Sequence, residues 1–187
     1  GVFTSNKMTA PPVLVTREHL ASTCGRAAAV VLNSGNANAA TGAAGKADAE
    51  AMCALTAEAL GCSPHEVLVC STGLIGFPLP MERITPAIPA LAATLAVNGG
   101  PAAARAIMTT DTVPRTTALT GTTLDGGTFT IGGVAKGAAM LEPNMATMLA
   151  VLTPDALLDA TTATDLLRSA VGVSFNCLTV DGAESTN

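Results

Sequence analysis

The sequence predicts a fold that combines helices with β-sheet, of the α+β or mixed α/β class, and three observations support that prediction. Short apolar runs of strand length alternate with longer Ala-rich stretches that have helical spacing. Two Thr-rich stretches meet at Asp125-Gly126-Gly127, a sequence typical of a β-hairpin. The 187 residues are also 49% hydrophobic and only 12% charged, which excludes a disordered chain because disorder requires low hydrophobicity and high charge.

We expect strands where an apolar run is short and ends at residues typical of turns. The predicted strands are residues 12–16, 27–32, 67–70, 115–123, 128–134, 147–152 and 175–180. We expect helices where Ala-rich or apolar residues recur at helical spacing. The predicted helical segments are a turn at residues 17–24 and helices at 45–60, 81–97, 102–108 and 164–171. Their many small Ala side chains favour close packing of helix on sheet.

Composition excludes several classes of function. The net charge is −5, Trp and Tyr are absent and only four Phe occur, so neither a basic patch nor a stacking surface for nucleic acid is expected. No apolar stretch is long enough to predict a membrane-spanning helix. The first residues do not resemble a secretory signal peptide. We therefore expect a cytoplasmic protein without a nucleic-acid or membrane partner.

The cysteines are odd in number and form no Cys-x-x-Cys pair, which predicts buried free thiols in a reducing compartment. They are Cys24, Cys53, Cys62, Cys70 and Cys177. His19 and His65, which we expect on the surface, do not pair with any of them at ligand spacing. No metal site is predicted.

The first catalytic candidate is Thr147, which follows Ala146 at the start of a predicted strand. A Thr without a His partner acts as a nucleophile when its own α-amine is the base, so the Ala146–Thr147 bond must break first. The hydroxyl can attack the preceding carbonyl, shift the acyl group from N to O, and leave an ester for water to hydrolyse. The released amine has an ordinary pKa near ~8, which suits a general base. An ordinary turn-to-strand junction is the alternative.

Two further segments are candidate binding elements. At residues 71–76, Thr72 and the glycines Gly73 and Gly76 follow a predicted strand and could offer donors to an oxyanion; a tight turn is the alternative. Residues 107–112 place consecutive hydroxyls beside a carboxylate, which suits a polar substrate, but helix termination is the preferred interpretation. The amide-rich loop at residues 33–38 is interpreted as structural.

Six segments, in order along essentially the whole chain, carry a family resemblance. They are residues 1–6 (GVFTSN), 33–42 (NSGNANAATG), 70–76 (CSTGLIG), 107–115 (IMTTDTVPR), 132–149 (GGVAKGAAMLEPNMATML) and 174–187 (SFNCLTVDGAESTN). Together they closely resemble the arginine-biosynthesis ornithine acetyltransferases, the bifunctional glutamate N-acetyltransferases of the ArgJ family. The resemblance implies an α+β fold of the DmpA/ArgJ type, with helices packed on mixed β-sheets and an autoproteolytic Thr nucleophile at a strand start.

The resemblance also implies a reaction. The precursor would cleave itself at Ala146–Thr147, and Thr147 would carry acetyl from N2-acetyl-L-ornithine to L-glutamate in a ping-pong cycle through an acetyl-enzyme ester. Ornithine and N-acetyl-L-glutamate would be the products. No cofactor is expected, and acetyl-CoA stays open as a second acetyl donor.

Further site residues follow from matching motifs. Thr72 and Gly73 match the family's oxyanion-hole pair. Lys136 matches a substrate-binding lysine, whose charge suits a carboxylate. Thr110 resembles the substrate-contacting Thr of the Thr-Thr-Asp segment, and Thr109 is the neighbour with which it is most easily confused.

The resemblance divides the chain into residues 1–146, an α-chain portion, and residues 147–187, the start of a β chain, within one compact unit. Both ends are expected to be truncated, so that a Glu and an Asn-Thr pair of the family's site have no counterpart here. An α2β2 assembly is expected. The alternatives are an autoproteolytic N-terminal-nucleophile aminopeptidase or amidohydrolase, with water as acceptor, and a non-catalytic binding fragment.

Overall fold

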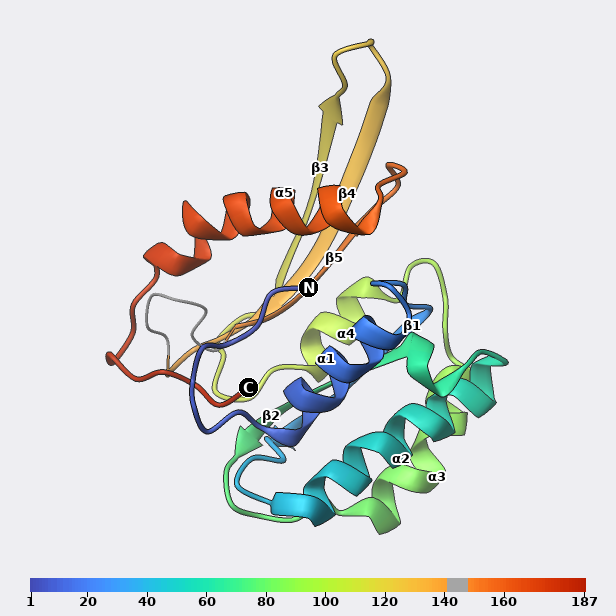
Figure 1. Cartoon of the computed structure of the whole chain (residues 1–187), viewed down its shortest axis with the longest axis vertical. Helices are drawn as coiled ribbons and strands as arrows, with labels where there is room; N and C mark the ends of the chain where they lie inside the picture. The colour runs from blue at the N-terminus through green and yellow to red at the C-terminus, as the bar shows by residue number, and fades with distance from the viewer. Residues whose placement is uncertain (141–147) are drawn as a thin grey trace.

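The computed structural model of the chain describes residues 1–140 and 148–187, and in this part it contains two sheets (Figure 1). Strands β1 (Ala29–Asn36) and β2 (Val67–Leu74) form a parallel pair. Strands β3 (Arg115–Thr122), β4 (Thr128–Lys136) and β5 (Leu149–Pro154) form an antiparallel sheet in that order. The helices are α1 (Pro11–Ser22), α2 (Gly42–Leu60), α3 (Met81–Ala92), α4 (Gly100–Ala106) and α5 (Ala160–Gly172). The predicted α+β class is confirmed.

Helix α1 corrects one prediction, because residues 12–16 are helical rather than extended. The β-branched run Pro-Val-Leu-Val-Thr favours a strand locally. Two prolines at the start are, however, compatible with the first turn of a helix, where the missing N–H is not needed. Burial decides the outcome: Val15 is 1% exposed and packs into the core formed with β1, β2 and α2.

The same helix covers the free edge of β2. Thr16 Oγ1 donates to the carbonyl of Val69 at 2.8 Å and accepts from its N–H at 3.0 Å. His19 Nδ1 lies 2.7 Å from the carbonyl of Val67, and its ring stacks on His65 at 5.0 Å. The prediction that His19 lies on the surface is therefore wrong, since its polar atom replaces a missing strand partner. His65 is exposed, as predicted.

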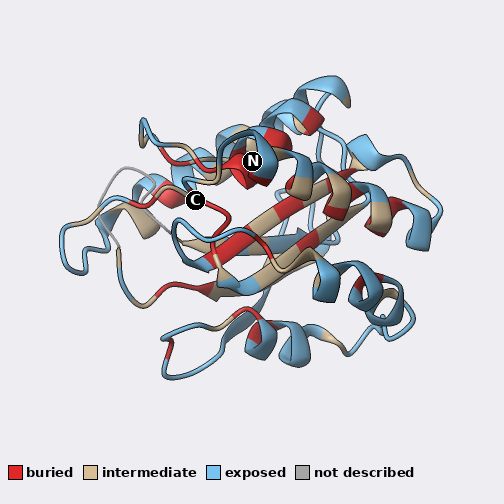
Figure 2. Ribbon diagram, turned by 90° about the horizontal axis from the view of Figure 1, so that it is seen from below, coloured by how far each residue is buried: buried red, intermediate tan, exposed pale blue. Residues whose placement is uncertain are grey.

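Strands β1 and β2 are parallel because α2 crosses between them. The helix ends at Gly61, whose φ of 72° is the left-handed conformation that glycine adopts without strain. The buried apolar core lies between this sheet and the helices (Figure 2). Its residues are Val15, Val31, Ala49, Met52, Cys53, Ala57, Val67, Val69, Leu79 and Ile88. Of the cysteines, Cys53 is buried as predicted, whereas Cys24 and Cys177 are exposed.

The second sheet confirms the predicted hairpin. Strands β3 and β4 pair from Arg115 opposite Ala135 to Thr122 opposite Thr128, and the hairpin projects away from the helices α1, α2 and α3 (Figure 1). Strand β5, at residues 149–154, overlaps the strand predicted at residues 147–152 but begins and ends two residues later. The predicted strand at residues 175–180 is wrong: Phe175–Cys177 is a short 3-10 turn, η2, and of the three residues that follow it only Val180 takes part in an isolated bridge.

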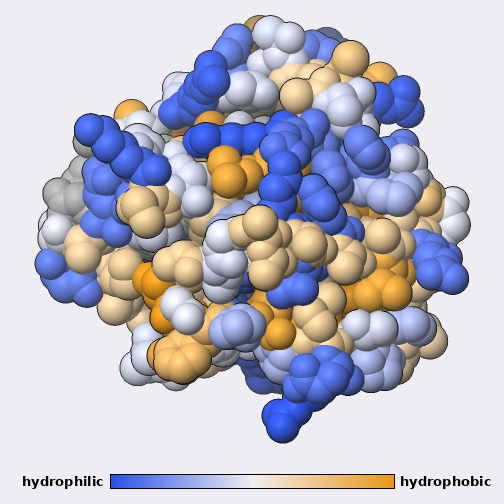
Figure 3. All heavy atoms as spheres, turned by 60° about the horizontal axis from the view of Figure 1, so that its bottom comes forward, coloured by the Kyte–Doolittle hydropathy of each residue, from blue (hydrophilic) through white to orange (hydrophobic). Residues whose placement is uncertain are grey.

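A cavity of about 390 Å³ separates the two sheets. Its lining is mostly apolar and comes from the N-terminal segment, α1, β1, β2, β5, α5 and η2. The outer surface that carries α2 and α3 shows apolar side chains in separate patches among hydrophilic ones (Figure 3). In the described ranges, no helix combines the length and apolar character that crossing a membrane requires.

Candidate functional site

The carboxyl end of β2 places Thr72 and Gly73 beside β1, opposite Ser34 and Gly35. Gly73 has a φ of 132°, a conformation that L side chains rarely adopt. A Cβ at this position would lie 2.3 Å from the carbonyl carbon of Gly35 and 2.5 Å from the nitrogen of Asn36. Only glycine fits, so the Gly73 backbone is held against β1 in one arrangement.

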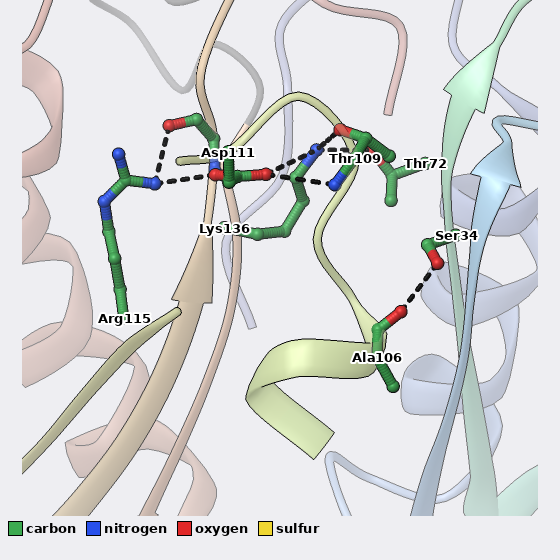
Figure 4. Close-up of polar contacts among 8 residues, drawn as sticks. Ser34, Thr72, Ala106, Thr109, Asp111, Arg115 and Lys136 are labelled. Atoms are coloured by element: carbon green, nitrogen blue, oxygen red, sulfur yellow. Dashed lines mark hydrogen bonds and ion pairs between the residues drawn. The ribbon is translucent and has the colours of Figure 1, made fainter. Parts of the chain in front are cut away.

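The end of β4 brings Lys136 to the same place (Figure 4). Its ammonium Nζ donates to Thr72 Oγ1 at 3.0 Å and to Thr109 Oγ1 at 2.7 Å. The Lys136 side chain is 7% exposed, and Thr72 is buried as well. Two predicted site residues from different sheets, Thr72 and Lys136, are thus in direct contact.

A buried carboxylate, Asp111, lies behind this lysine. Its Oδ2 is 3.7 Å from Lys136 Nζ and accepts from the Thr109 N–H at 3.2 Å. Its Oδ1 accepts from Arg115 Nη1 at 2.7 Å and from the Gly137 N–H at 2.9 Å. Arg115 Nη1 also donates to the carbonyl of Gly137 at 2.9 Å. The carboxylate therefore ties the segment after α4 to the ends of β3 and β4.

Burial and charge act in opposite directions on these groups. Burial lowers the pKa of Lys136, and the Asp111 carboxylate offsets part of that shift. Burial alone would raise the pKa of Asp111, but the N–H groups of Gly137 and Thr109, the charge of Lys136 and the hydrogen bond from Arg115 together hold it below its ordinary value. Asp111 is consequently ionised at neutral pH.

A hydrogen bond from β1 positions the segment that carries Thr109 and Asp111. Ser34 Oγ donates to the carbonyl of Ala106, the last residue of α4, at 2.6 Å (Figure 4). Since Ser34 lies opposite Thr72 in the parallel sheet, the two sides of the site share one scaffold.

The remaining predicted site residues are not part of this hydrogen-bonded cluster in the described part of the chain. Thr110 is exposed, and among the described residues its side chain forms no hydrogen bond; Thr109 is the member of the pair that contacts Lys136. Ala146 and Thr147 lie outside the described residues. The roles predicted for all of these residues stay predictions.

Sequence reasoning missed Asp111 and Arg115. The signal was present, because the segment at residues 107–112 was identified as a cluster of hydroxyls beside a carboxylate. What it could not show is that Asp111 is buried, with its side chain 1% exposed, against a lysine from another sheet. Within the described ranges, no three His, Cys, Asp or Glu side chains come together as metal ligands.

The arrangement suits chemistry on an anionic group or a polarised carbonyl. A buried ammonium, a hydroxyl and a fixed glycine backbone at one strand end are the donors that stabilise developing negative charge. The cavity between the sheets differs from this polar site, because it is lined mostly by apolar side chains and Lys136 is not among its lining residues.

Comparison with known proteins finds the same family by a family model and by individual relatives. The model of the ArgJ family matches residues 1–187. The chain is 53% identical to the arginine biosynthesis bifunctional protein ArgJ of Geobacter sulfurreducens and 51% identical to that of Symbiobacterium thermophilum. Each match covers 100% of this chain, but 47% and 46% of the respective relatives. The chain therefore spans about half the length of these relatives.

Two solved structures are similar to the fold. One is the crystal structure of ArgJ from Bacillus halodurans, with a TM-score of 0.71 and 44% identity over 78% of this chain and 75% of that one. The other is ornithine acetyltransferase from Mycobacterium tuberculosis complexed with ornithine, with a TM-score of 0.69 and 46% identity over 80% of this chain and 76% of that one.

Proposed function

The chain belongs to the ArgJ family, and from this premise we propose that it carries out acetyl transfer from N2-acetyl-L-ornithine to L-glutamate in arginine biosynthesis. The observation that carries the proposal is the contact between the buried Lys136 ammonium and the Thr72 hydroxyl, beside the constrained Gly73 backbone. These residues match the family's substrate lysine and oxyanion-hole pair. A relative in the same family was solved with ornithine bound.

The nucleophile in this proposal is Thr147, released by self-cleavage. Its hydroxyl oxygen attacks the Ala146 carbonyl carbon, the C–N bond breaks, and the nitrogen takes up the proton to become a free amine. Water then hydrolyses the resulting ester. The new α-amine, in its neutral form, accepts the proton of the Thr147 hydroxyl during the later acyl transfers.

Acetyl transfer then follows in two half-reactions. Thr147 Oγ attacks the acetyl carbonyl of N2-acetyl-L-ornithine, and ornithine leaves as the protonated amine, which gives an acetyl ester on Thr147. The amine of glutamate attacks this ester, and the hydroxyl is restored. Thr72 and Gly73 stabilise the oxyanion of each tetrahedral intermediate, and Lys136 attracts the substrate carboxylate. Thr110 is the proposed additional substrate contact.

The proposal extends to the assembly and the compartment. We expect an α2β2 heterotetramer of cleaved chains in the cytoplasm, where the five free cysteines would stay reduced. Acetyl-CoA should be tested as a second acetyl donor in the same assay, because the relatives are named as bifunctional proteins.

The decisive test uses the full-length protein that carries this chain. Intact mass and N-terminal sequencing should find two chains, the second beginning with Thr147. Thr147→Ala should abolish cleavage and acetyl transfer together, whereas Thr147→Ser, which keeps a hydroxyl, should retain both at a reduced rate. Cleavage of the Thr147→Ala protein at the same bond would show that the nucleophile is assigned wrongly.

The acceptor distinguishes the alternatives. Acetylornithine is supplied with and without glutamate, and both N-acetylglutamate and acetate are measured. N-acetylglutamate as the main product supports the proposal, and acetate with no dependence on glutamate supports an amidohydrolase. An uncut protein that still binds acetylornithine would support a binding module.

A further inference from the structure

Asp111 is the most completely enclosed carboxylate of the site, and the proposed reaction gives it no role. Its side chain is 1% exposed. Four groups converge on it: the ammonium of Lys136, the guanidinium of Arg115 and the N–H groups of Thr109 and Gly137. A carboxylate that loses its water needs such partners, because an unpaired buried charge is costly.

The two carboxylate oxygens have different surroundings. Oδ1 accepts from Arg115 and from the Gly137 N–H, which fixes the carboxylate to the ends of β3 and β4. Oδ2 accepts from the Thr109 N–H and lies 3.7 Å from Lys136 Nζ. One oxygen thus anchors the side chain and the other faces the site (Figure 4).

The Thr72 hydroxyl accepts a hydrogen bond from Lys136 and, among the described residues, keeps its own proton free to donate. It accepts from Lys136 Nζ at 3.0 Å, and within residues 1–140 and 148–187 it donates to no other group. An O–H whose oxygen accepts from a cation becomes a stronger donor, because successive hydrogen bonds polarise one another. The Thr72 proton is therefore available for an oxyanion.

We propose that Asp111 is a positioning residue that keeps Lys136 charged and directed at the Thr72 hydroxyl, so that Thr72 donates to the oxyanion. This inference rests on the proposed acetyl transfer. It gives Lys136 a second task beyond attracting a substrate carboxylate, namely to orient and polarise the oxyanion-hole hydroxyl.

Electrostatics supports this assignment. Of the charged groups in the described part of the chain, Asp111 from the segment after α4 and Arg115 from β3 act on the charge of Lys136; β2 contributes the uncharged Thr72. Burial lowers the pKa of Lys136, Asp111 raises it and Arg115 lowers it. Without the carboxylate, two cations would face each other with no anion between them. The pKa of Lys136 would then fall further.

The test compares Asp111→Asn with wild type in the full-length protein. The amide has the same shape and keeps an oxygen that can accept from Arg115 and Gly137, but it carries no charge, and its NH2 group cannot accept from the Thr109 N–H. Cleavage is first checked by intact mass, and kcat and KM for transfer from N2-acetyl-L-ornithine to L-glutamate are then measured across neutral and alkaline pH. The matched control is Asp125→Asn, at an exposed turn between β3 and β4.

We expect Asp111→Asn to lower kcat about tenfold or more, with a smaller change in KM, because the lost contact acts on the oxyanion. The alkaline limb of the kcat profile should also move to lower pH by about one unit or more, as Lys136 loses its proton more easily. Asp125→Asn should leave both kcat and the limb unchanged.

Several outcomes overturn the proposal. One is an unshifted alkaline limb in a folded Asp111→Asn protein, because a merely structural loss lowers activity equally at every pH. If that variant does not fold, Lys136→Arg is measured instead. The charge of an arginine does not titrate in the measured pH range, so the alkaline limb of the residual activity should move out of that range. An alkaline limb that stays where it is in wild type overturns the assignment. A wild-type protein that transfers no acetyl group contradicts the proposed function itself. That result differs from failure of the Asp111 proposal, in which the wild-type protein is active.

Discussion

The two sheets of the molecule are held in different ways. The parallel pair β1–β2 lies against helices, and its inward residues, such as Val67 and Val69, are 0% and 1% exposed. The antiparallel sheet has an outer strand, β3, in which every residue except Gly121 is exposed. The first sheet is thus stabilised by apolar burial, whereas the second is anchored at its base by hydrogen bonds and ion pairs around Asp111.

This difference shows what each sheet contributes to the site. The buried sheet supplies fixed backbone, because Gly73 cannot move without meeting Gly35. The exposed sheet supplies charge, because its strand β4 ends at Lys136. The site forms where the two meet, so changes to either sheet should affect activity only through the few residues at that junction.

The largest effect is expected from Gly73→Ala. The new Cβ would lie within 2.3–2.6 Å of three backbone atoms of Gly35 and Asn36, so the end of β2 must shift. Loss of an oxyanion-hole donor costs about 100-fold or more in kcat, so the role proposed for Gly73 predicts at least that loss of acetyl transfer. Single-turnover and steady-state assays of the full-length protein measure it.

The control for this substitution is Gly100→Ala in α4. A Cβ there meets nothing within 4 Å, and Ala is favoured over Gly in a helix. Activity should therefore stay at the wild-type level. If Gly73→Ala were as active as Gly100→Ala, the end of β2 would not be the rigid half of the site.

The next effect concerns stability and compares the two sheets directly. Met52→Ala removes a side chain that is 1% exposed in the core beside β1 and β2, so the free energy of unfolding should fall by about 2–5 kcal/mol. Leu119→Ala, at a position 68% exposed on β3, should change it by less than about 0.5 kcal/mol. Denaturant titration of both variants provides the values. A loss of several kcal/mol at Leu119 would mean that the hairpin is covered in the whole protein.

The sequence predicted those parts of the fold whose signals are local. Helix α2 and the β3–β4 hairpin follow from spacing and turn residues, and both are confirmed. Residues 12–16 were predicted wrongly because their β-branched run hides a helix that is stabilised by packing on β2. That packing joins residues far apart in the chain, and no local pattern reports it.

The same limit applies to the candidate site. Family resemblance suggested Thr72 and Lys136, and the structure brings them within 3.0 Å. Asp111 stands in a segment for which helix termination was the preferred interpretation, since the role of this carboxylate depends on its burial beside a lysine from another sheet. Thr147, the central prediction, lies outside the described residues, so its role depends on the cleavage experiment.

The smallest effect should come from Ser34→Ala, which tests the hydrogen bond between β1 and the end of α4. Its hydroxyl donates to the carbonyl of Ala106 at 2.6 Å, just before the segment that carries Thr109 and Asp111. Loss of one such bond costs about 1 kcal/mol of stability. We also expect a fall in kcat of about threefold, because small displacements of positioned groups slow catalysis.

Thr94→Ala is the matched control for that variant. Thr94 Oγ1 also donates to a backbone carbonyl, that of Leu91 at 2.8 Å, but this bond is local to the end of α3 and does not connect to the site. The two variants should therefore lose similar stability, and only Ser34→Ala should lose activity. Equal kcat values in the two proteins would show that the segment after α4 is positioned by the Asp111 contacts alone, without help from β1.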